Sequence, residues 1–534
     1  MARKISIRPN LIDRMVMALD PVRGQRRLAA RAQIDYAMGA YTGAAKDRNA
    51  TKNWNVTNAD ADGDTLPDLE TLRTRSRDLV RSNPLACGAL NTKVTNIVGT
   101  GLRVQSQIDA DYLGLSPDQA DEWQRAAERE FRFFSGSPEC DLERTYAFPL
   151  MQELALRSCF ENGDVFAVLP YVERDGFPWG TKVQLIEADR CCNKNGEQDT
   201  DRLAGGIEKD EWGAPSRYHF SETHPNNTSS DRAGKWQVLD AFGANGRRNV
   251  LHIHKKLRPG QTRGVPDLAP VIEAFKQLGR YTEAELMAAV VSGMFTVFIE
   301  TETGEGLAGM DEKTGTTGAK PTFDLGYGTV VDLASGEKVS TANPGRPNVA
   351  FDPFILAIMR QIGVALELPF EILIKHFTAS YSASRAALLE AWRMFKSRRV
   401  WFAEMFCQPI YEAVITESVM RGRLYAPGYL EDFTIRQAYL RSIWTGDAPG
   451  QLDPLKETRA AAERVAEDFS TRARETAELT GGDWDQNVAQ RGREERRRKA
   501  EGLGIVAMPS PFPAQQDQQD RQDPEDEQNN DQQN

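Results

Sequence analysis

Apolar residues recur every three or four positions over several long stretches of the chain, a spacing that predicts amphipathic helices. From residue 66 onward, Leu69, Leu72 and Leu79 follow this spacing until Asn83-Pro84, which predicts a helix boundary. The same pattern predicts further helices at 84–98, 117–134, 149–160 and 267–293. Helix is therefore the main element expected in the first two-thirds of the chain.

Short β-rich runs separate these helices in the middle of the chain. Such runs predict strands at 165–170, 183–186, 217–220, 236–239 and 250–254, with Gly and Asn turns between them. Two more strands are expected at 295–300 and 329–333, on either side of a Gly- and Thr-rich loop. The predicted fold class is therefore α+β and mainly helical.

The last third returns to helix. The pattern predicts helix over 351–421, interrupted near Leu368-Pro369 and again over 378–382. Asp453 before Pro454 predicts a capped helix that runs on to Leu479, and Asp483 is expected to cap a final helix. After Pro509 the chain is almost free of apolar residues, a composition typical of disorder.

Charge is spread unevenly along the 534 residues, whose net charge is −11. Residues 1–50 carry ten Lys and Arg against four Asp, and residues 511–534 carry seven acids against one Arg. The acidic balance argues against a protein that wraps nucleic acid tightly, because such binding needs clustered cations at the phosphates. No apolar run reaches 18 residues, so no membrane-spanning helix is expected. Six cysteines without paired spacing fit synthesis in a reducing cytosol.

Sequence motifs of enzymes are missing, so we expect no catalytic residue, cofactor or metal. The phosphate loop of ATPases, the dinucleotide-binding glycine motif and the zinc-protease and serine-hydrolase motifs do not occur. His252 and His254 are interpreted as polar strand residues rather than a metal pair, and Cys191-Cys192 as a packed or partly exposed pair rather than a redox or metal pair. Residues 161–164 are interpreted as a helix-to-strand turn rather than a carboxylate pair.

Two clusters allow a nucleic-acid role beside a structural one. The first is a basic helix segment, interpreted mainly as a solvated face, with DNA contact as the alternative; it comprises Arg491, Arg493, Arg496, Arg497, Arg498 and Lys499. The second is an aromatic group at helical spacing, for which core packing is favoured over base stacking; it comprises Trp392, Phe395, Trp401, Phe402 and Phe406.

Four groups of segments, in this order along the chain, resemble the lambda-like portal proteins of tailed phages. They are RSRDLVRSNPLACGA at 75–89 with NIVGTGL at 96–102; ENGDVF at 161–166; LRPGQTRGVP at 257–266; and LELPF at 366–370 with FTASYSASR at 377–385 and an aromatic helix that ends in FCQP at 406–409. The resemblance covers about residues 10 to 500.

The resemblance implies a ring, usually of twelve subunits, at one vertex of the capsid. Double-stranded DNA would be packaged through its channel by a separate terminase large subunit, and would later leave through the tail. The major capsid protein with its scaffold and a head-completion or tail connector are the other implied partners, with no membrane. The implied location is the virion, with assembly in the host cytoplasm. Twelve copies would carry about −132, which repels phosphate and lets DNA slide.

Portal subunits have a wing, a stem, a clip and a crown, and these names divide the chain as follows. We expect a basic N-terminal segment at 1–65, the wing at 66–266, the first stem helix at 267–292, the clip at 293–349, the second stem helix at 350–367, a channel loop at 368–384, further wing helices at 385–452, the crown at 453–508 and a disordered tail at 509–534. Phe275 on the first stem helix is expected to contact a neighbouring subunit.

The channel loop is the candidate DNA-contacting segment. Its hydroxyls and few cations suit weak, exchangeable phosphate contacts; they are Lys375, His376, Thr378, Ser380, Tyr381, Ser382, Ser384 and Arg385. The structural alternative is that Ser382 or Ser384 caps the following helix. Other classes considered for the whole chain are a head-completion or connector protein and a phage-coded nuclease or protease.

Overall fold

The computed structural model describes residues 10–37, 49, 51, 53–54, 56, 58–293, 297–301, 337–341, 351–377, 380–451 and 453–503. They belong to two compact units, Met1–Asp64 and Thr65–Asn534. The predicted tail at 509–534, the predicted strand at 329–333 and most of the predicted clip lie outside the described residues.

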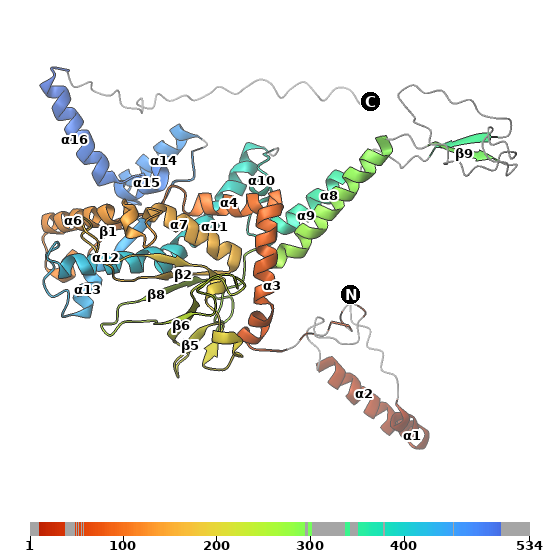
Figure 1. The fold of residues 1–534 in the computed structure, drawn as a ribbon. Helices are drawn as coiled ribbons and strands as arrows, with labels where there is room; N and C mark the ends of the chain where they lie inside the picture. The colour runs from red at the N-terminus through yellow and green to blue at the C-terminus, as the bar shows by residue number, and fades with distance from the viewer. Residues whose placement is uncertain are drawn as a thin grey trace, which may run out of the picture. The chain divides into compact units, whose positions relative to one another are not determined.

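The first unit contains a helical hairpin of α1 (Leu11–Leu19) and α2 (Pro21–Ala37) (Figure 1). Asn10 caps α1 through its side chain, which accepts from the Asp13 amide at 2.8 Å. The buried Asp13 carboxylate pairs with Arg27 of α2 at 3.0 Å. These contacts fix the two helices against each other.

A layer of helices forms the body of the second unit (Figure 1). Its main helices are α3 (Ala61–Ser82), α4 (Pro84–Ile97), α6 (Pro117–Ser135), α7 (Phe148–Asn162), α11 (Tyr381–Phe402), α12 (Gln408–Met420) and α13 (Phe433–Leu440). Asn83 caps α4 and Ser116 caps α6, as the helix-start signals in the sequence require. Phe131 packs edge-on against Phe148 and Tyr411, and these rings lie at the centre of the core.

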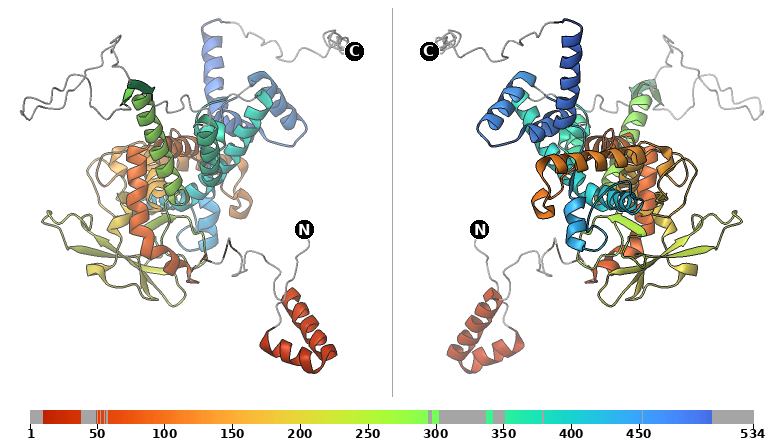
Figure 2. Two further views of the ribbon diagram at one scale, coloured as in Figure 1. Left: turned by 90° about the vertical axis from the view of Figure 1, so that its right-hand side faces the viewer. Right: turned by 90° about the vertical axis from the view of Figure 1, so that its left-hand side faces the viewer.

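Two antiparallel sheets lie on one side of this helical layer (Figures 1 and 2). The first has the order β3-β2-β8, and the second the order β4-β5-β6-β7. Their strands are β2 (Asp164–Val168), β3 (Gln184–Ile186), β4 (Leu203–Ala204), β5 (Ile207–Lys209), β6 (Pro215–Ser221), β7 (Trp236–Asp240) and β8 (Val250–His254). Phe166, Tyr218 and Phe220 fill a smaller core between them.

Several short elements were not expected from the sequence. Residues far apart in the chain pair as β1 (Arg103–Ser106) and β11 (Ser442–Thr445). The other short elements that were not expected are α5 (Ala110–Leu113) and 3-10 turns at Pro138–Cys140, Ala188–Arg190 and Lys194–Gly196. Two more, α10 (Phe370–Leu373) and a 3-10 turn at Ala269–Val271, lie where the sequence predicted helix. The predicted α+β, mainly helical class is confirmed.

The paired helices α8 (Ile272–Gly293) and α9 (Phe351–Ala365) project from the body side by side (Figure 1). Residues 297–301 and 337–341 form an antiparallel pair, β9 and β10, in the chain between them. The expected break after the second helix is present, because Glu367 adopts a left-handed φ of 58° and Pro369 starts α10.

One prediction for the last third was wrong. The expected helix from Asp453 to Leu479 is two helices, α14 (Pro454–Ala466) and α15 (Arg472–Thr480), because Asp468 turns the chain with a φ of 58°. The predicted helix across Pro409 is confirmed: a π-helical turn at 403–407 joins α11 to α12, and this turn accommodates the missing proline N–H. Asp483 caps α16 (Trp484–Ala500) as expected.

Candidate functional site

Two of the segments that carry the resemblance, 161–166 and 257–266, meet at one buried carboxylate, Asp164. Arg73 of α3 donates to Asp164 Oδ1 at 2.8 Å, and Arg263 donates from Nε to Oδ2 at 2.6 Å. The ring of His252 on β8 lies 3.1 Å from Oδ2 through its Nε2. Asp164 is fully buried, and Arg263 and Arg73 are 1% and 5% exposed. We call these four residues the Asp164 cluster.

The charges of the Asp164 cluster determine its protonation. Burial alone would raise the pKa of Asp164, but Arg263 and Arg73 outweigh burial and hold that pKa well below its usual range. Burial, with the neighbouring His254, lowers the pKa of His252 to about 3. The histidine is therefore neutral, and the cluster is an ionised carboxylate between two guanidinium groups.

Arg263 also donates hydrogen bonds to the backbone of the segments between β3 and β5. Its Nη1 donates to the Cys191 carbonyl at 2.7 Å and to the Gly205 carbonyl at 2.6 Å, and Nη2 donates to Ala188 at 2.7 Å. One side chain therefore donates to three backbone carbonyls, of which those of Ala188 and Cys191 belong to buried residues. This arrangement identifies a structural junction, with every guanidinium nitrogen engaged.

Two glycines allow this junction to close. Gly163, the turn after α7, has a φ of 91° and lies directly against Gly264. A Cβ built on Gly163 would lie 2.5 Å from the Gly264 carbonyl oxygen, and one built on Gly264 would overlap the Gly163 carbonyl. The interpretation of 161–164 as a helix-to-strand turn is confirmed, and Asp164 has a buried structural role that the sequence did not reveal.

Three of the four residues weighed for metal or redox chemistry have buried side chains, and the fourth, Cys192, is half-buried. The rings of His252 and His254 stack with centroids 3.8 Å apart, on one side of β8 as the alternation predicted. The His252 side chain is 7% exposed and His254 is buried. Cys191 is buried and burial raises its pKa to about 12, which supports a packed thiol.

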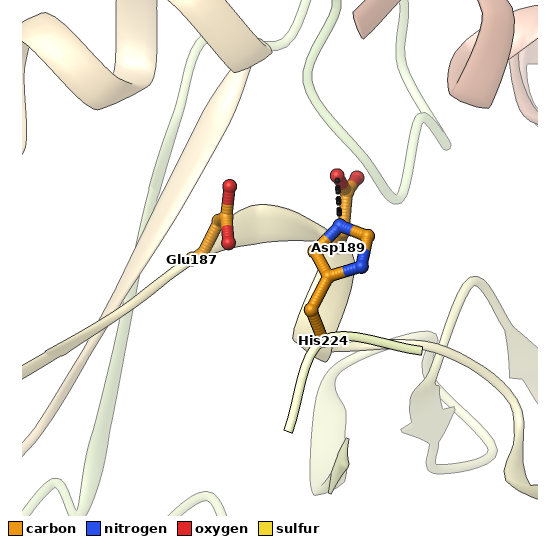
Figure 3. Close-up of side chains that lie close together, drawn as sticks. All are labelled: Glu187, Asp189 and His224. Atoms are coloured by element: carbon orange, nitrogen blue, oxygen red, sulfur yellow. Dashed lines mark hydrogen bonds and ion pairs between the residues drawn. The ribbon is translucent and has the colours of Figure 1, made fainter. Parts of the chain in front are cut away.

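Glu187, Asp189 and His224 lie close enough together to suggest a cation site (Figure 3). His224 Nε2 is 3.3 Å from Asp189 Oδ2. The two carboxylates already have cationic partners, because Arg77 pairs with both acids and Arg73 lies 3.3 Å from Asp189. A divalent cation would meet two guanidinium groups at its ligands, so these residues do not fit a metal.

The α8–α9 hairpin differs from the expected stem in one respect. Phe275 is 1% exposed and packs, with Leu278, into the core of its own subunit. The expectation that Phe275 contacts a neighbour is therefore wrong. The apolar stripe of α8 packs into the core of its own subunit near the start of the helix and is exposed only farther along. Farther along α8, Leu286 is 64% and Val290 47% exposed, and Phe354 of α9 is 51% exposed.

The candidate channel segment is an exposed connection between α10 and α11. Lys375 has a left-handed φ of 55°, and the His376 amide donates to the Glu371 carbonyl at 3.0 Å. Both side chains are exposed. Thr378 and the side chain of Tyr381 lie outside the described residues.

The serines of this segment form the start of α11. Ser380 occupies the N-cap position without a side-chain cap bond, and its Oγ lies 3.2 Å from Ser382 Oγ. The alternative that Ser382 or Ser384 caps the helix is wrong, since both lie inside its first turn. Arg385 pairs with Glu457 of α14 at 3.9 Å, so it contacts the predicted crown.

The basic cluster lies on α16, which the structure describes in full. None of its residues is buried, and Arg493 donates to Gln490 at 3.1 Å. A solvated face is what the structure shows for this segment. The aromatic group is core: Phe395, Phe402 and Phe406 are at most 3% exposed, while Trp392 and Trp401 pack against the same core.

Within the described residues, no helix combines the length and apolar character needed to cross a bilayer.

Comparison with known proteins identifies the family. The model for "Phage portal protein, lambda family" matches residues 47–399, about two-thirds of the chain. Portal protein B of Escherichia phage lambda is 25% identical over 475 residues, which cover 85% of this chain and 88% of that protein. The portal protein of Escherichia phage N15 is 25% identical over 479 residues, covering 85% and 89%.

A solved structure of the neck of a native gene transfer agent particle aligns with 77% of this chain and 92% of its own, at 13% identity and a TM-score of 0.42. Proteins of the matched family are structural components of the virion. From the family match over two-thirds of its length, the chain belongs to the lambda family of phage portal proteins.

Proposed function

We propose that this chain assembles into a homo-oligomeric ring at the capsid vertex and that the α8–α9 hairpin is its stem. The ring surrounds the channel through which double-stranded DNA is packaged and later released. One observation carries the stem assignment: the far part of the hairpin exposes large apolar side chains, of which Leu286, Met287 and Val290 are 64%, 58% and 47% exposed.

These side chains favour a neighbouring subunit as their cover. The near part of the hairpin is anchored by Phe275 and Leu278 in the subunit core, and Tyr281 packs against Phe354 with ring centroids 5.0 Å apart. The hairpin is thus held in place while its far part remains apolar and uncovered. In a closed ring the same face repeats around the axis, and each copy can cover the next.

The experiment replaces Leu286 and Val290 together by Asp. Charges in a dry helix contact oppose association, so we expect the purified variant to elute as a 59.6 kDa subunit, while the unmodified chain forms a ring, about 0.7 MDa for twelve copies. Light scattering after size exclusion measures the mass. Gln277→Asp adds a charge at an exposed polar position of the same helix and should leave the ring intact. Rings of normal mass from the double variant would overturn the stem assignment.

The remaining divisions of the chain are part of the same proposal. The wing is 66–266 with 385–452, the clip 293–349 and the crown 453–508. A separate terminase large subunit supplies ATP hydrolysis; the major capsid protein, its scaffold and a head-completion or tail connector complete the vertex, with assembly in the host cytoplasm. Twelve subunits is the proposed ring number.

The α10–α11 connection is the proposed channel loop. Lys375 and His376 are exposed where the chain turns between two helices, and this exposure supports the assignment. A few exposed cations and hydroxyls give weak phosphate contacts that exchange readily with water. The exposed arginines of α16 are a second, independent candidate for DNA contact.

Replacing Lys375 and His376 by Glu tests the loop. We expect rings to assemble normally but particles to retain shorter DNA, measured by gel electrophoresis of the packaged genome, because two carboxylates repel the phosphates. Lys396→Glu, an exposed cation of α11 that already pairs with Glu478 at 3.1 Å, is the matched control. Full-length DNA in the double variant would refute DNA contact by this loop.

A further inference from the structure

The N-terminal hairpin (α1–α2, residues 10–37) exposes an apolar stripe on its short first helix. Leu11, Met15 and Leu19 follow one another at four-residue spacing and are 76%, 63% and 89% exposed, and Ile12 beside them is 55% exposed. Another side of α1 faces α2, since Asp13 is buried and pairs with Arg27 of α2. The stripe is therefore the outward face of a fixed hairpin.

The charge of this region is opposite to that of the rest of the chain. The hairpin, residues 10–37, carries five Arg against three Asp, a net charge of +2, while the whole chain carries −11. Arg14, Arg23 and Arg26 of the hairpin are exposed. A partner for this surface should combine apolar contact with negative charge, which the phosphates of a DNA duplex supply only in part.

The second unit presents a surface of that kind where α5 lies against the start of α13. Tyr112, Leu430 and Phe433 are 59%, 53% and 64% exposed, and the Tyr112 hydroxyl lies 2.8 Å from Thr434 Oγ1. Asp109 pairs with Arg441 at 3.1 Å, and the Arg436 guanidinium lies over the Phe433 ring. Four acids and two arginines lie on or next to α5 and the start of α13: Asp109, Asp111, Glu431, Asp432, Arg436 and Arg441. We call Tyr112, Leu430 and Phe433 with these acids the acidic–aromatic patch.

We propose that the N-terminal hairpin docks on the acidic–aromatic patch of a second copy of this chain, so that each subunit holds its neighbour by an exchanged arm. The inference rests on the proposed ring. Twenty-three residues separate α2 from α3 and can span at most about 75 Å, which brings an adjacent subunit within reach. In a ring, this tethering gives every arm a high effective concentration of partner patches.

Site-specific photocross-linking tests the docking in full-length rings. Met15→benzoylphenylalanine should yield, on irradiation, a species of twice the subunit mass in denaturing gels, with the cross-link mapped by mass spectrometry to peptides containing Leu430 and Phe433. The same probe at Gln25, an exposed polar residue of α2, serves as the positional control. Adding Leu430→Ser and Phe433→Ser should abolish the doubled species, whereas Trp212→Ser, at an 86% exposed aromatic elsewhere, should not.

The outcomes separate this inference from the ring itself. Intact rings with no cross-link from position 15, or with one inside a single chain, to nucleic acid or to another surface, overturn the arm exchange and leave the ring proposal standing. A chain that stays monomeric under all conditions overturns both. Because opposite charges contribute to the docking, the doubled species should also decrease as salt is raised.

Discussion

Asp164→Asn is expected to destabilise the subunit by about 3–5 kcal/mol, the cost of breaking a buried ion pair from one side. The amide cannot neutralise Arg73 and Arg263, which would remain charged with 5% and 1% of their surface exposed. An amide NH₂ would also face guanidinium donors where a carboxylate oxygen now accepts. We expect a markedly lower thermal unfolding midpoint for the purified subunit and more protein in inclusion bodies.

The pH dependence of the stability loss in Asp164→Asn shows whether the lost ion pairs are its cause. The pKa of Asp164 is lowered in the folded subunit, so its ion pairs stabilise the fold fully above its unfolded pKa of about 3.9 and lose that contribution as the pH falls toward the folded value. The gap in unfolding midpoint between the natural chain and the variant should therefore be constant near neutrality and narrow below about pH 4.

Asp78→Asn is the matched control, because it removes the same charge from an exposed ion pair of α3. The two side chains of that pair, Arg81 and Asp78, are 79% and 50% exposed. Exposed pairs contribute about 1 kcal/mol or less. An Asp164 variant as stable as the Asp78 variant would show that the cluster contributes no more than a surface pair.

Gly264→Ala is expected to cost about 3 kcal/mol, at the top of the range for overpacked sites. The added methyl group would overlap the carbonyl oxygen of Gly163, which is backbone and cannot rotate away like a side chain. Relief requires the α7–β2 turn to separate from the segment that carries Arg263, so the hydrogen bonds of Asp164 should lengthen with it. Thermal unfolding and protease resistance of the purified subunit measure the effect.

Gly279→Ala provides the control in the same region of the chain. A Cβ at Gly279, inside α8, meets no atom within 4 Å. Alanine there should stabilise the helix by about 0.5–1 kcal/mol, since glycine is the more costly residue to order. If both alanine variants behaved alike, close backbone approach at Gly264 could not be what constrains that position.

Local signals in the sequence were enough to place elements with strong ends. Asn83-Pro84 separates α3 from α4, and Asp483 caps α16, because a capping side chain acts on amides two or three residues away. The break between α14 and α15 was missed because Asp468, the left-handed residue, is neither Gly nor Pro. The pair β1–β11 was missed for two reasons. Its strands are only four residues long, and the paired residues Arg103 and Thr445 are 342 residues apart in the sequence.

The Asp164 cluster shows the same limit at the site. Each residue has an ordinary local interpretation: Arg73 on an Arg-rich helix, Asp164 after a turn, Arg263 in a Gly- and Pro-containing loop. Only the fold brings them together across 91 and 99 residues of sequence. A charged residue at the start of an otherwise fully buried strand was the one available signal, because an unpaired charge is rarely placed there.

The long separation within the Asp164 cluster has a consequence for synthesis on the ribosome. β2 is the middle strand of its sheet, yet its partner β8 and the guanidinium of Arg263 follow it by about a hundred residues. While the intervening chain is being translated, Asp164 has one arginine and an open strand edge, a state in which apolar strands invite misfolding. Once residue 264 has emerged, the sheet and the cluster can close together, and α8 is the next long helix to leave the exit tunnel. The order of the chain thus lets this sheet and the Asp164 cluster close before the helices proposed to join subunits are exposed to other copies.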